Sequence, residues 1–344
     1  MMDFHRNLPR RSFLGVAAGA AIPASAFSST LEDTLNPAFT TSIKAFPQDY
    51  LQGLSASEAS FYSLHRDTAS KHSYRLSRLT VDGKAVWSKN LRAGVFYTGI
   101  CAAASGECLA FGMEPAVRRL SAAGFRPDGT EIGPFDLGSE PLVSSCLLGQ
   151  NLVAYQANGD VRVQNLSTGA VQTMPAVLQV QEIASGHTPP YLKTSLEAVG
   201  GDRCLLIDHT LGRLVLLNLA DRGAQTSRLS DPSVETGLQR SREFLAAAMP
   251  ASAPGQRPTP ATPAILAATA GDGRGGVFGL VSPMNQQRAL VLHFSPDGSV
   301  QRRFRCALPD RAAEKFKVPF HMALASGTLL LAFPDSMVSG YVLG

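Results

Sequence analysis

Histidine side chains offer the clearest opportunity for chemistry in this sequence, because imidazole can bind a metal ion or move a proton near neutral pH. Beyond the first 26 residues, five histidines lie outside the interior of apolar segments: His65, His72, His187, His209 and His321. His187 and His321 are the stronger metal or ligand candidates, since each lies before or at the start of an apolar segment. Five histidines are close to average usage, so ordinary polar loop residues are the alternative.

Two common catalytic motifs are absent from the sequence, and one segment matches a third motif in its pattern of glycines only. Neither G-x-S-x-G nor H-E-x-x-H occurs. Residues 271–276 match G-x-G-x-x-G, but a dinucleotide fingerprint requires a helix after the glycines, and the strand-like segment 277–281 follows instead. We therefore interpret this match as a hairpin turn, and no particular cofactor is predicted.

The five cysteines show no C-x-x-C spacing, so a zinc or redox motif is not indicated. Cys101 and Cys108 flank a turn at Ser105 and Gly106, and we place both on the same face of a hairpin. They could pair in an oxidising compartment, or both could stay free. The odd number leaves at least one thiol unpaired, which we expect to be buried as a small apolar side chain.

The N-terminal segment has the layout of an export signal. It contains two arginines, two apolar residues, an apolar run and a small-residue cleavage pattern, in this order: Arg10, Arg11, Phe13, Leu14, 15–22 and 24–26. This arrangement resembles the twin-arginine signal peptides of bacteria, and we assign residues 1–26 to the signal. Its apolar part is shorter than the roughly 20 residues that a membrane-spanning helix needs.

The signal predicts a periplasmic protein. It also carries about half of the formal net charge of +4, so the rest of the chain is nearly neutral and no nucleic-acid partner is predicted. No later segment is long and apolar enough to cross a membrane. Twin-arginine export generally carries folded chains, which fits a fold that needs no disulfide or one loaded with a cofactor before export.

Beyond residue 40, short apolar segments alternate with turn signals, which predicts an all-β domain. A unit of four strands recurs in the segments 97–137, 142–175, 196–229 and 264–308. The turn before the last strand of a unit carries a glycine: Gly83, Gly129, Gly169, Gly223 and Gly298. The intervals of 46, 40, 54 and 75 residues match four-stranded propeller blades once an insertion is removed from the last.

We assign that insertion to residues 231–263. Asp231 and Pro232 predict the start of a short helix that continues through Phe244 and Leu245, and 250–263 is rich in proline. A lid, a partner-docking arm and a tolerated surface loop are all compatible with such an insertion.

The chain finishes with three strand-like segments, and the segment 39–46 can supply the fourth strand of that blade. Closing the ring in this way removes free sheet edges. The sequence therefore predicts a single β-propeller of about six blades over 39–344, after a linker at 27–38; seven blades are the alternative if 170–200 holds another strand pair. The rhythm of blades and glycine turns resembles six-bladed propellers of the NHL and TolB-like kind, a resemblance of fold that implies little about activity.

In a propeller, the loops between second and third strands emerge on the same rim as the starts of the first strands. We place His65, His72 and His209 in such loops, and His187 and His321 at the starts of first strands. The predicted ligand-binding rim, at the mouth of the central channel, consists of Tyr97, His187, Tyr191, Lys193, His209, Arg288, Lys317 and His321.

Two functions from different classes fit this sequence. We expect a monomeric periplasmic module that binds a protein, a peptide or a small ligand, because no catalytic motif is present. The alternative is a hydrolase or oxidoreductase that uses a metal or cofactor held by the histidines of the rim.

Overall fold

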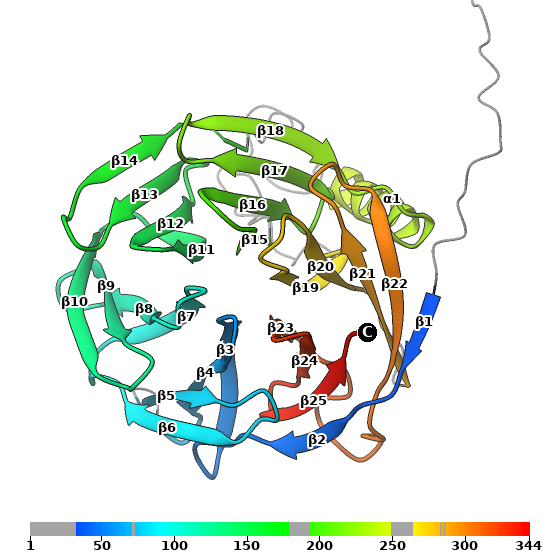
Figure 1. Cartoon of the computed structure of the whole chain (residues 1–344), viewed down its shortest axis with the longest axis horizontal. Coiled ribbons are helices and arrows are strands. Elements are labelled where there is room, and N and C mark those ends of the chain that lie inside the picture. The colour runs from blue at the N-terminus through cyan, green and yellow to red at the C-terminus, as the bar shows by residue number, and fades with distance from the viewer. Residues whose placement is uncertain are drawn as a thin grey trace, which may run out of the picture. The chain divides into compact units, whose positions relative to one another are not determined.

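Glycine-containing turns divide the chain into short strands, and these strands assemble into a ring of small sheets (Figure 1). The structure is a computed structural model that describes residues 32–70, 73–175, 177–178, 193–248, 264–282, 284 and 287–344. Within these residues, six sheets succeed one another around a central axis, and each sheet is one blade of a β-propeller.

The first strand of each blade lies nearest the centre of the ring, and the following strands pair outward in antiparallel order (Figure 1). Blade 1 comprises β3 (Asp49–Ala56), β4 (Phe61–Asp67), β5 (Tyr74–Leu79) and β6 (Ala85–Asn90). Blade 2 comprises β7 (Phe96–Ala102), β8 (Cys108–Glu114), β9 (Arg119–Phe125) and β10 (Glu131–Gly138). Blade 3 comprises β11 (Leu142–Leu148), β12 (Asn151–Gln156), β13 (Val161–Asn165) and β14 (Val171–Met174).

The other three blades follow the same pattern. Blade 4 comprises β15 (Thr194–Ala198), β16 (Arg203–Asp208), β17 (Arg213–Asn218) and β18 (Gly223–Arg228). Blade 5 comprises β19 (Leu266–Gly271), β20 (Val277–Val281), β21 (Arg288–Phe294) and β22 (Val300–Ala307). Blade 6 comprises β23 (His321–Ala325), β24 (Thr328–Ala332), β25 (Met337–Val342) and the N-terminal strand β2 (Phe39–Ser42). The predicted all-β propeller of six four-stranded blades is confirmed.

The ring is closed by β2, which pairs antiparallel with β25 as predicted. Phe39 lies opposite Gly340, and Ser42 lies opposite Met337. The Phe39 ring covers Gly340 so closely that a Cβ atom there would come within 2.2 Å of a ring carbon. This glycine therefore allows the closing strand to approach.

The segment predicted to be a linker, 27–38, contains a strand. β1 (Glu32–Leu35) pairs in parallel with the outer strand β22 and extends blade 5 to five strands. Asp33 Oδ2 lies 2.7 Å from Arg302 Nη2, and Glu32 forms an ion pair with Arg305. These ion pairs hold β1 against the outer edge of blade 5.

Apolar side chains on both faces of each sheet form the core. Among the described residues they gather in six clusters, one between each pair of neighbouring blades. Along β16, Cys204 and Leu206 belong to the cluster shared with blade 3, whereas Leu205 and Ile207 belong to the cluster shared with blade 5. Both faces of the strand are buried, which explains the nearly continuous apolar segments of the sequence.

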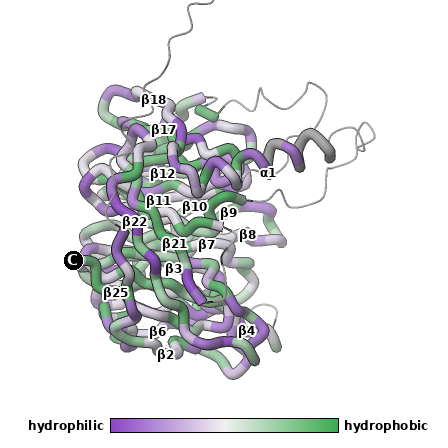
Figure 2. Tube along the Cα trace, turned by 90° about the vertical axis from the view of Figure 1, so that its right-hand side faces the viewer, coloured by the Kyte–Doolittle hydropathy of each residue, from purple (hydrophilic) through white to green (hydrophobic). Residues whose placement is uncertain are grey.

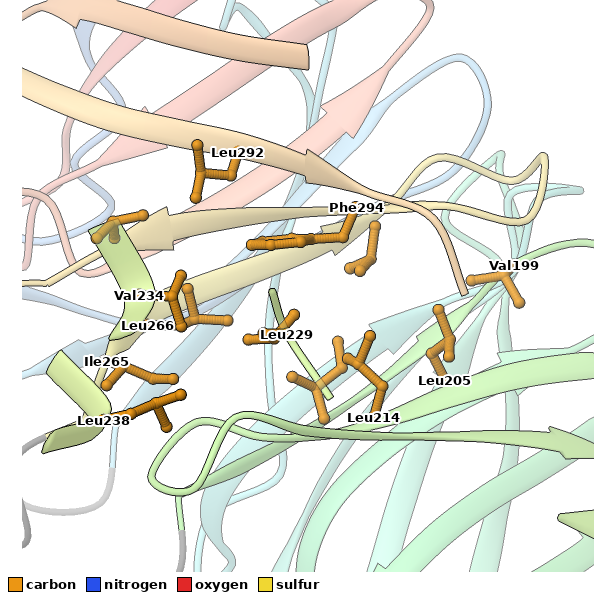
Figure 3. Packing of buried hydrophobic residues seen from close by; sticks show 13 residues of the cluster. Val199, Leu205, Leu214, Leu229, Val234, Leu238, Ile265, Leu266, Leu292 and Phe294 are labelled. Atoms are coloured by element: carbon orange, nitrogen blue, oxygen red, sulfur yellow. The ribbon is translucent and has the colours of Figure 1, made fainter. Parts of the chain in front are cut away.

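The predicted insertion begins with helix α1 (Pro232–Ala248), which is longer than the sequence indicated. The Asp231 carboxylate caps this helix by accepting a hydrogen bond from the Ser233 backbone N–H at 2.8 Å. Val234 and Leu238 pack with Ile265 in the core between blades 4 and 5 (Figure 3). Seen from the side, α1 projects from one face of the ring (Figure 2).

The remaining residues of the predicted insertion, 249–263, lie outside the described residues. Within the part of the chain that the structure describes, no helix combines the length and the apolar character needed to span a bilayer.

The G-x-G-x-x-G spelling at 271–276 is a hairpin turn between β19 and β20, as interpreted from the sequence. The Asp272 carboxylate accepts hydrogen bonds from the backbone N–H groups of Arg274 at 2.7 Å and Gly276 at 2.8 Å. Its other oxygen lies 2.9 Å from His293 Nε2. These contacts of the Asp272 side chain stabilise the turn.

The prediction that Cys101 and Cys108 share a face of the β7–β8 hairpin is wrong. Cys101 lies opposite Leu109, and Cys108 lies opposite Ala102, so the two cysteines point to opposite faces of the sheet. Cys101 packs in the core shared with blade 3, and Cys108 packs in the core shared with blade 1. Both thiols are free and buried, and burial raises the pKa of Cys101 to about 12.

Gly298 provides a test of how tightly the blade turns are packed. Its φ is +87°, and a Cβ atom would lie 1.9 Å from the Arg228 carbonyl oxygen in blade 4. Gly169 has a similar φ of +73°, but nothing lies within 4 Å of its Cβ position. We predict that Gly169→Ala costs about 1 kcal/mol of unfolding free energy through backbone strain alone. Gly298→Ala should cost at least about 2 kcal/mol more, because the backbone must move.

Urea unfolding of both variants measures this difference. Equal losses of stability in the two variants would show that the contact between blades 4 and 5 at this turn is unimportant.

Candidate functional site

One face of the ring carries the long connections, and we call it the loop face. On this face lie the turns between second and third strands and the connections from each blade to the next. The connections that precede β15, β19 and β23 are much longer than those that precede β7 and β11. Long connections on a rigid scaffold are common places for binding and catalytic residues. The loop face is therefore where a site is expected.

His209 lies on the loop face, in the turn between β16 and β17, as the sequence predicted. The preceding residue shapes this turn: the buried Asp208 carboxylate accepts hydrogen bonds from the backbone N–H groups of Thr210 at 2.9 Å and Leu211 at 3.0 Å. Arg213 holds the other carboxylate oxygen at 2.8 Å. This turn directs the His209 imidazole into the protein interior, and the residue is 2% exposed.

Around His209, four side chains from two blades form one continuous chain of contacts. His209 Nε2 lies 2.8 Å from Ser195 Oγ in β15, which lies 2.5 Å from Thr269 Oγ1 in β19. Thr269 Oγ1 lies 2.6 Å from Glu197 Oε1, and the Gly271 backbone N–H donates to Glu197 Oε2 at 3.1 Å. At the other end, His209 Nδ1 donates to the Leu266 carbonyl at 3.0 Å. We call these four side chains the Glu197–His209 chain.

Burial favours the neutral forms of both titratable groups in this chain. Desolvation, together with a smaller contribution from the positive charge of Lys193, lowers the pKa of His209 to about 3. Desolvation also raises the pKa of Glu197 above its ordinary value, against the opposing hydrogen bonds from Thr269 and Gly271. Thr269 Oγ1 donates to Glu197 Oε1, so the chain ends at an acceptor that burial makes harder to ionise.

Two further predicted rim residues join neighbouring blades on this face. Lys193 Nζ donates to the Ala267 carbonyl in blade 5, and desolvation lowers its pKa. His321, the first residue of β23, donates from Nε2 to the Leu51 carbonyl in blade 1 at 3.1 Å. Desolvation lowers the pKa of His321 to about 4, so its imidazole is neutral at neutral pH.

The carbonyl groups that accept these hydrogen bonds lie at β-bulges. β3 and β19 each contain one extra residue relative to their partners, at Gln52 and Ala267. A bulge disrupts the ladder locally and leaves backbone groups without a partner in the sheet. Side chains from the preceding blade supply donors to the carbonyl groups at or beside these bulges.

The other predicted rim residues are not brought into this cluster. Tyr97 is buried in the core between blades 1 and 2, edge-to-face with Tyr74. Arg288, at the start of β21, lies farther out beside helix α1. Lys317 lies in the connection between β22 and β23, half-buried. His72, His187 and Tyr191 lie outside the described residues.

His65 was predicted in a loop, but it lies within β4 and is fully buried. Its Nδ1 is 2.8 Å from Asp49 Oδ2, and its Nε2 is 2.8 Å from Ser63 Oγ. These distances resemble those of a Ser-His-Asp hydrolase triad. However, the three side chains are inaccessible, and Ser336 of blade 6 also donates to Asp49. The group ties blade 1 to blade 6 and offers no surface to a substrate.

Sequence reasoning missed Ser195, Glu197 and Thr269. The alternation of Ser195 and Glu197 along β15 places both on one face of the strand, which was a usable signal. Among the described residues, no three His, Cys, Asp or Glu side chains gather so that they could hold a metal ion. The predicted metal pair of His187 and His321 has one member outside the described residues.

Comparisons with known proteins agree on the fold. The structure of RRP9 WD40 repeats has a TM-score of 0.57 at 10% identity, covering 90% of this chain and 99% of that chain. The U3-55K structure has a TM-score of 0.56 at 9% identity, covering 90% and 100%. A protein of unknown function from Bacteroides thetaiotaomicron has a TM-score of 0.51 at 15% identity, covering 91% and 75%. No family model and no curated protein matches the sequence, so this likeness shows the propeller fold alone.

The raised pKa of Glu197 predicts a specific pH dependence. A carboxyl group whose pKa is raised on folding stabilises the protein at acid pH, and this contribution is lost as the pH rises through the folded-state pKa. Glu197→Gln keeps one acceptor oxygen and the size of the side chain but cannot ionise. We predict that wild type and this variant have similar melting temperatures at pH 5 and that the variant is more stable at pH 8.

Glu197→Ala serves as the control, because it leaves both partners unsatisfied and should cost about 1–3 kcal/mol at either pH. If wild type gained stability relative to Glu197→Gln between pH 5 and pH 8, folding would lower the pKa of Glu197 and the assigned direction of its shift would be wrong.

Proposed function

We propose that the protein is exported to the periplasm and uses the loop face of its propeller to bind a protein or peptide partner. The observation that carries this proposal is the concentration of long connections and helix α1 on one face. The opposite face has short hairpin turns such as those at Gly106, Gly149 and Gly298. The similarity to a WD40 structure supports a binding role only through the fold, because propellers of this architecture present several loops to one ligand.

The polar side chains that join neighbouring blades on the loop face also favour binding over catalysis. His209, His321 and Lys193 are occupied by contacts between blades, and both imidazoles are neutral. Such contacts make the loop face rigid, and a rigid scaffold reduces the entropy cost of presenting loops to a partner.

Site-specific photocrosslinking in cells tests this proposal. A photoreactive residue at Lys317 or Arg240 lies on the loop face, and one at Ser105 or Asp128 lies on the opposite face as a matched control. We expect defined crosslinked products from the loop-face positions only. Lysine in place of both Arg10 and Arg11 should keep the chain in the cytoplasm and remove these products.

Equal crosslinking from both faces would exclude the loop face as the binding surface. Export that persists in the lysine variant would exclude the twin-arginine route.

An enzyme is the second candidate, and one contact favours it. Ser195 Oγ lies 2.8 Å from His209 Nε2, within the reach of a nucleophile and its general base. A fluorophosphonate probe distinguishes the two functions, because it labels an activated serine covalently. We predict no labelling, since Ser195 is held on both sides by His209 and Thr269. Stoichiometric labelling that is lost in Ser195→Ala would establish a serine hydrolase instead.

A further inference from the structure

A cavity lies between helix α1 and blade 5, away from the Glu197–His209 chain. Its volume is about 220 Å³, below the 300 Å³ or more of pockets for drug-sized ligands. The walls come from one side of α1, from the end of β20 and from the beginning of β21. Because β20 ends and β21 begins on the loop face, the cavity belongs to that face.

Helix α1 presents a regular row of residues to this cavity. Ser233, Thr236, Gly237 and Arg240 stand at positions i, i+3, i+4 and i+7, which places them on one side of the helix. Val234 and Leu238 lie on another side and are buried in the core between blades 4 and 5 (Figure 3). The core contacts therefore fix the rotation of α1 and hold the row toward the cavity.

Three arginines line the cavity, and they come from three separate elements. Arg240 lies on α1, Arg288 on β21 and Arg305 on β22. The lining residues include no carboxylate, although Glu32 of β1 pairs with Arg305 from outside the lining. Guanidinium groups bind planar anions through paired N–H donors. The charge of the cavity thus favours an anion.

Apolar side chains form the rest of the wall. Val281, Met284, Ala289 and Leu290 lie along the cavity, and Ser233 and Ser282 also line it. A purely inorganic anion would leave this apolar surface without a partner. A short hydrocarbon chain would fill it and release water.

We propose that this cavity binds a small organic carboxylate, with the carboxylate among Arg240, Arg288 and Arg305 and a short hydrocarbon chain against Val281 and Leu290. The carboxylate is that of a free small molecule or that of the C-terminus of a peptide. This inference shares only the loop face with the proposed function, because a small carboxylate can bind the cavity without a partner protein.

Isothermal titration of the purified, natively exported protein tests this site. The probes are butanoate, hexanoate and octanoate, with 1-hexanol and inorganic phosphate as controls that lack the charge or the hydrocarbon chain. We expect at least one carboxylate to bind in a 1:1 ratio, and both controls to bind at least tenfold more weakly. Acetyl-Ala-Leu and its C-terminal amide identify the source, since a peptide terminus would bind more tightly than the alkanoates and lose its affinity on amidation.

Two kinds of variant probe the cavity without disturbing the blades. Arg240→Ala should weaken carboxylate binding at least tenfold, and Thr236→Phe should block the cavity while keeping its charge. Both positions are exposed on α1, so unchanged melting temperatures are expected. Arg274→Ala, on the opposite face of blade 5, is the matched control and should bind like wild type.

Three results would overturn the proposal: no binding of any alkanoate or of the peptide at 10 mM, phosphate binding as tight as the best carboxylate, or unchanged affinity in Arg240→Ala. None of these three results would change the crosslinking expected from the loop face. Loss of loop-face crosslinks with carboxylate binding intact would overturn the proposed function alone.

Discussion

Closure of the ring by β2 is the interaction on which the rest of the structure depends. Every core cluster among the described residues is shared by two neighbouring blades, so an open ring would expose two apolar faces at once. The closing contact joins Thr40 Oγ1 to Ser339 Oγ at 3.1 Å, across 299 residues of sequence. Local turns and strands can form without this contact, but the cores at blade 6 cannot be completed without it.

The blades could be predicted from the sequence because their signals are local. A glycine turn, an apolar strand and a helix cap such as Asp231 each depend on a few neighbouring residues. Features that depend on distant partners could not be predicted. β1 has no apolar pattern and is held by arginines of β22, which lie about 270 positions later. The faces of Cys101 and Cys108 depend on the pairing register of β7 with β8.

The candidate site could likewise be predicted only where its signals are local. Strand order alone places His209 and His321 on the loop face, and the structure agrees. The partners of His209 could not be predicted, because Thr269 lies 74 residues after Ser195 and reaches it only when blades 4 and 5 stand side by side. His65 was misplaced because the polar residues after it resemble a loop, whereas β4 continues to Asp67 and buries the imidazole against Asp49.

The bulges explain why polar side chains are needed near the centre of the ring. An inner strand that bulges turns carbonyl groups away from its own sheet, and a buried carbonyl without a donor costs about 1–3 kcal/mol. His209 and Lys193 belong to blade 4 and His321 to blade 6, whose inner strands β15 and β23 pair without a register shift. Each donates to the bulged inner strand of the next blade. A histidine used in this way must keep one N–H group directed at a carbonyl and must remain neutral in a desolvated position. The geometry of a closed ring therefore explains His209 and His321, which first indicated metal or proton chemistry. Each imidazole must keep one tautomer because its N–H group donates to a carbonyl of the next blade.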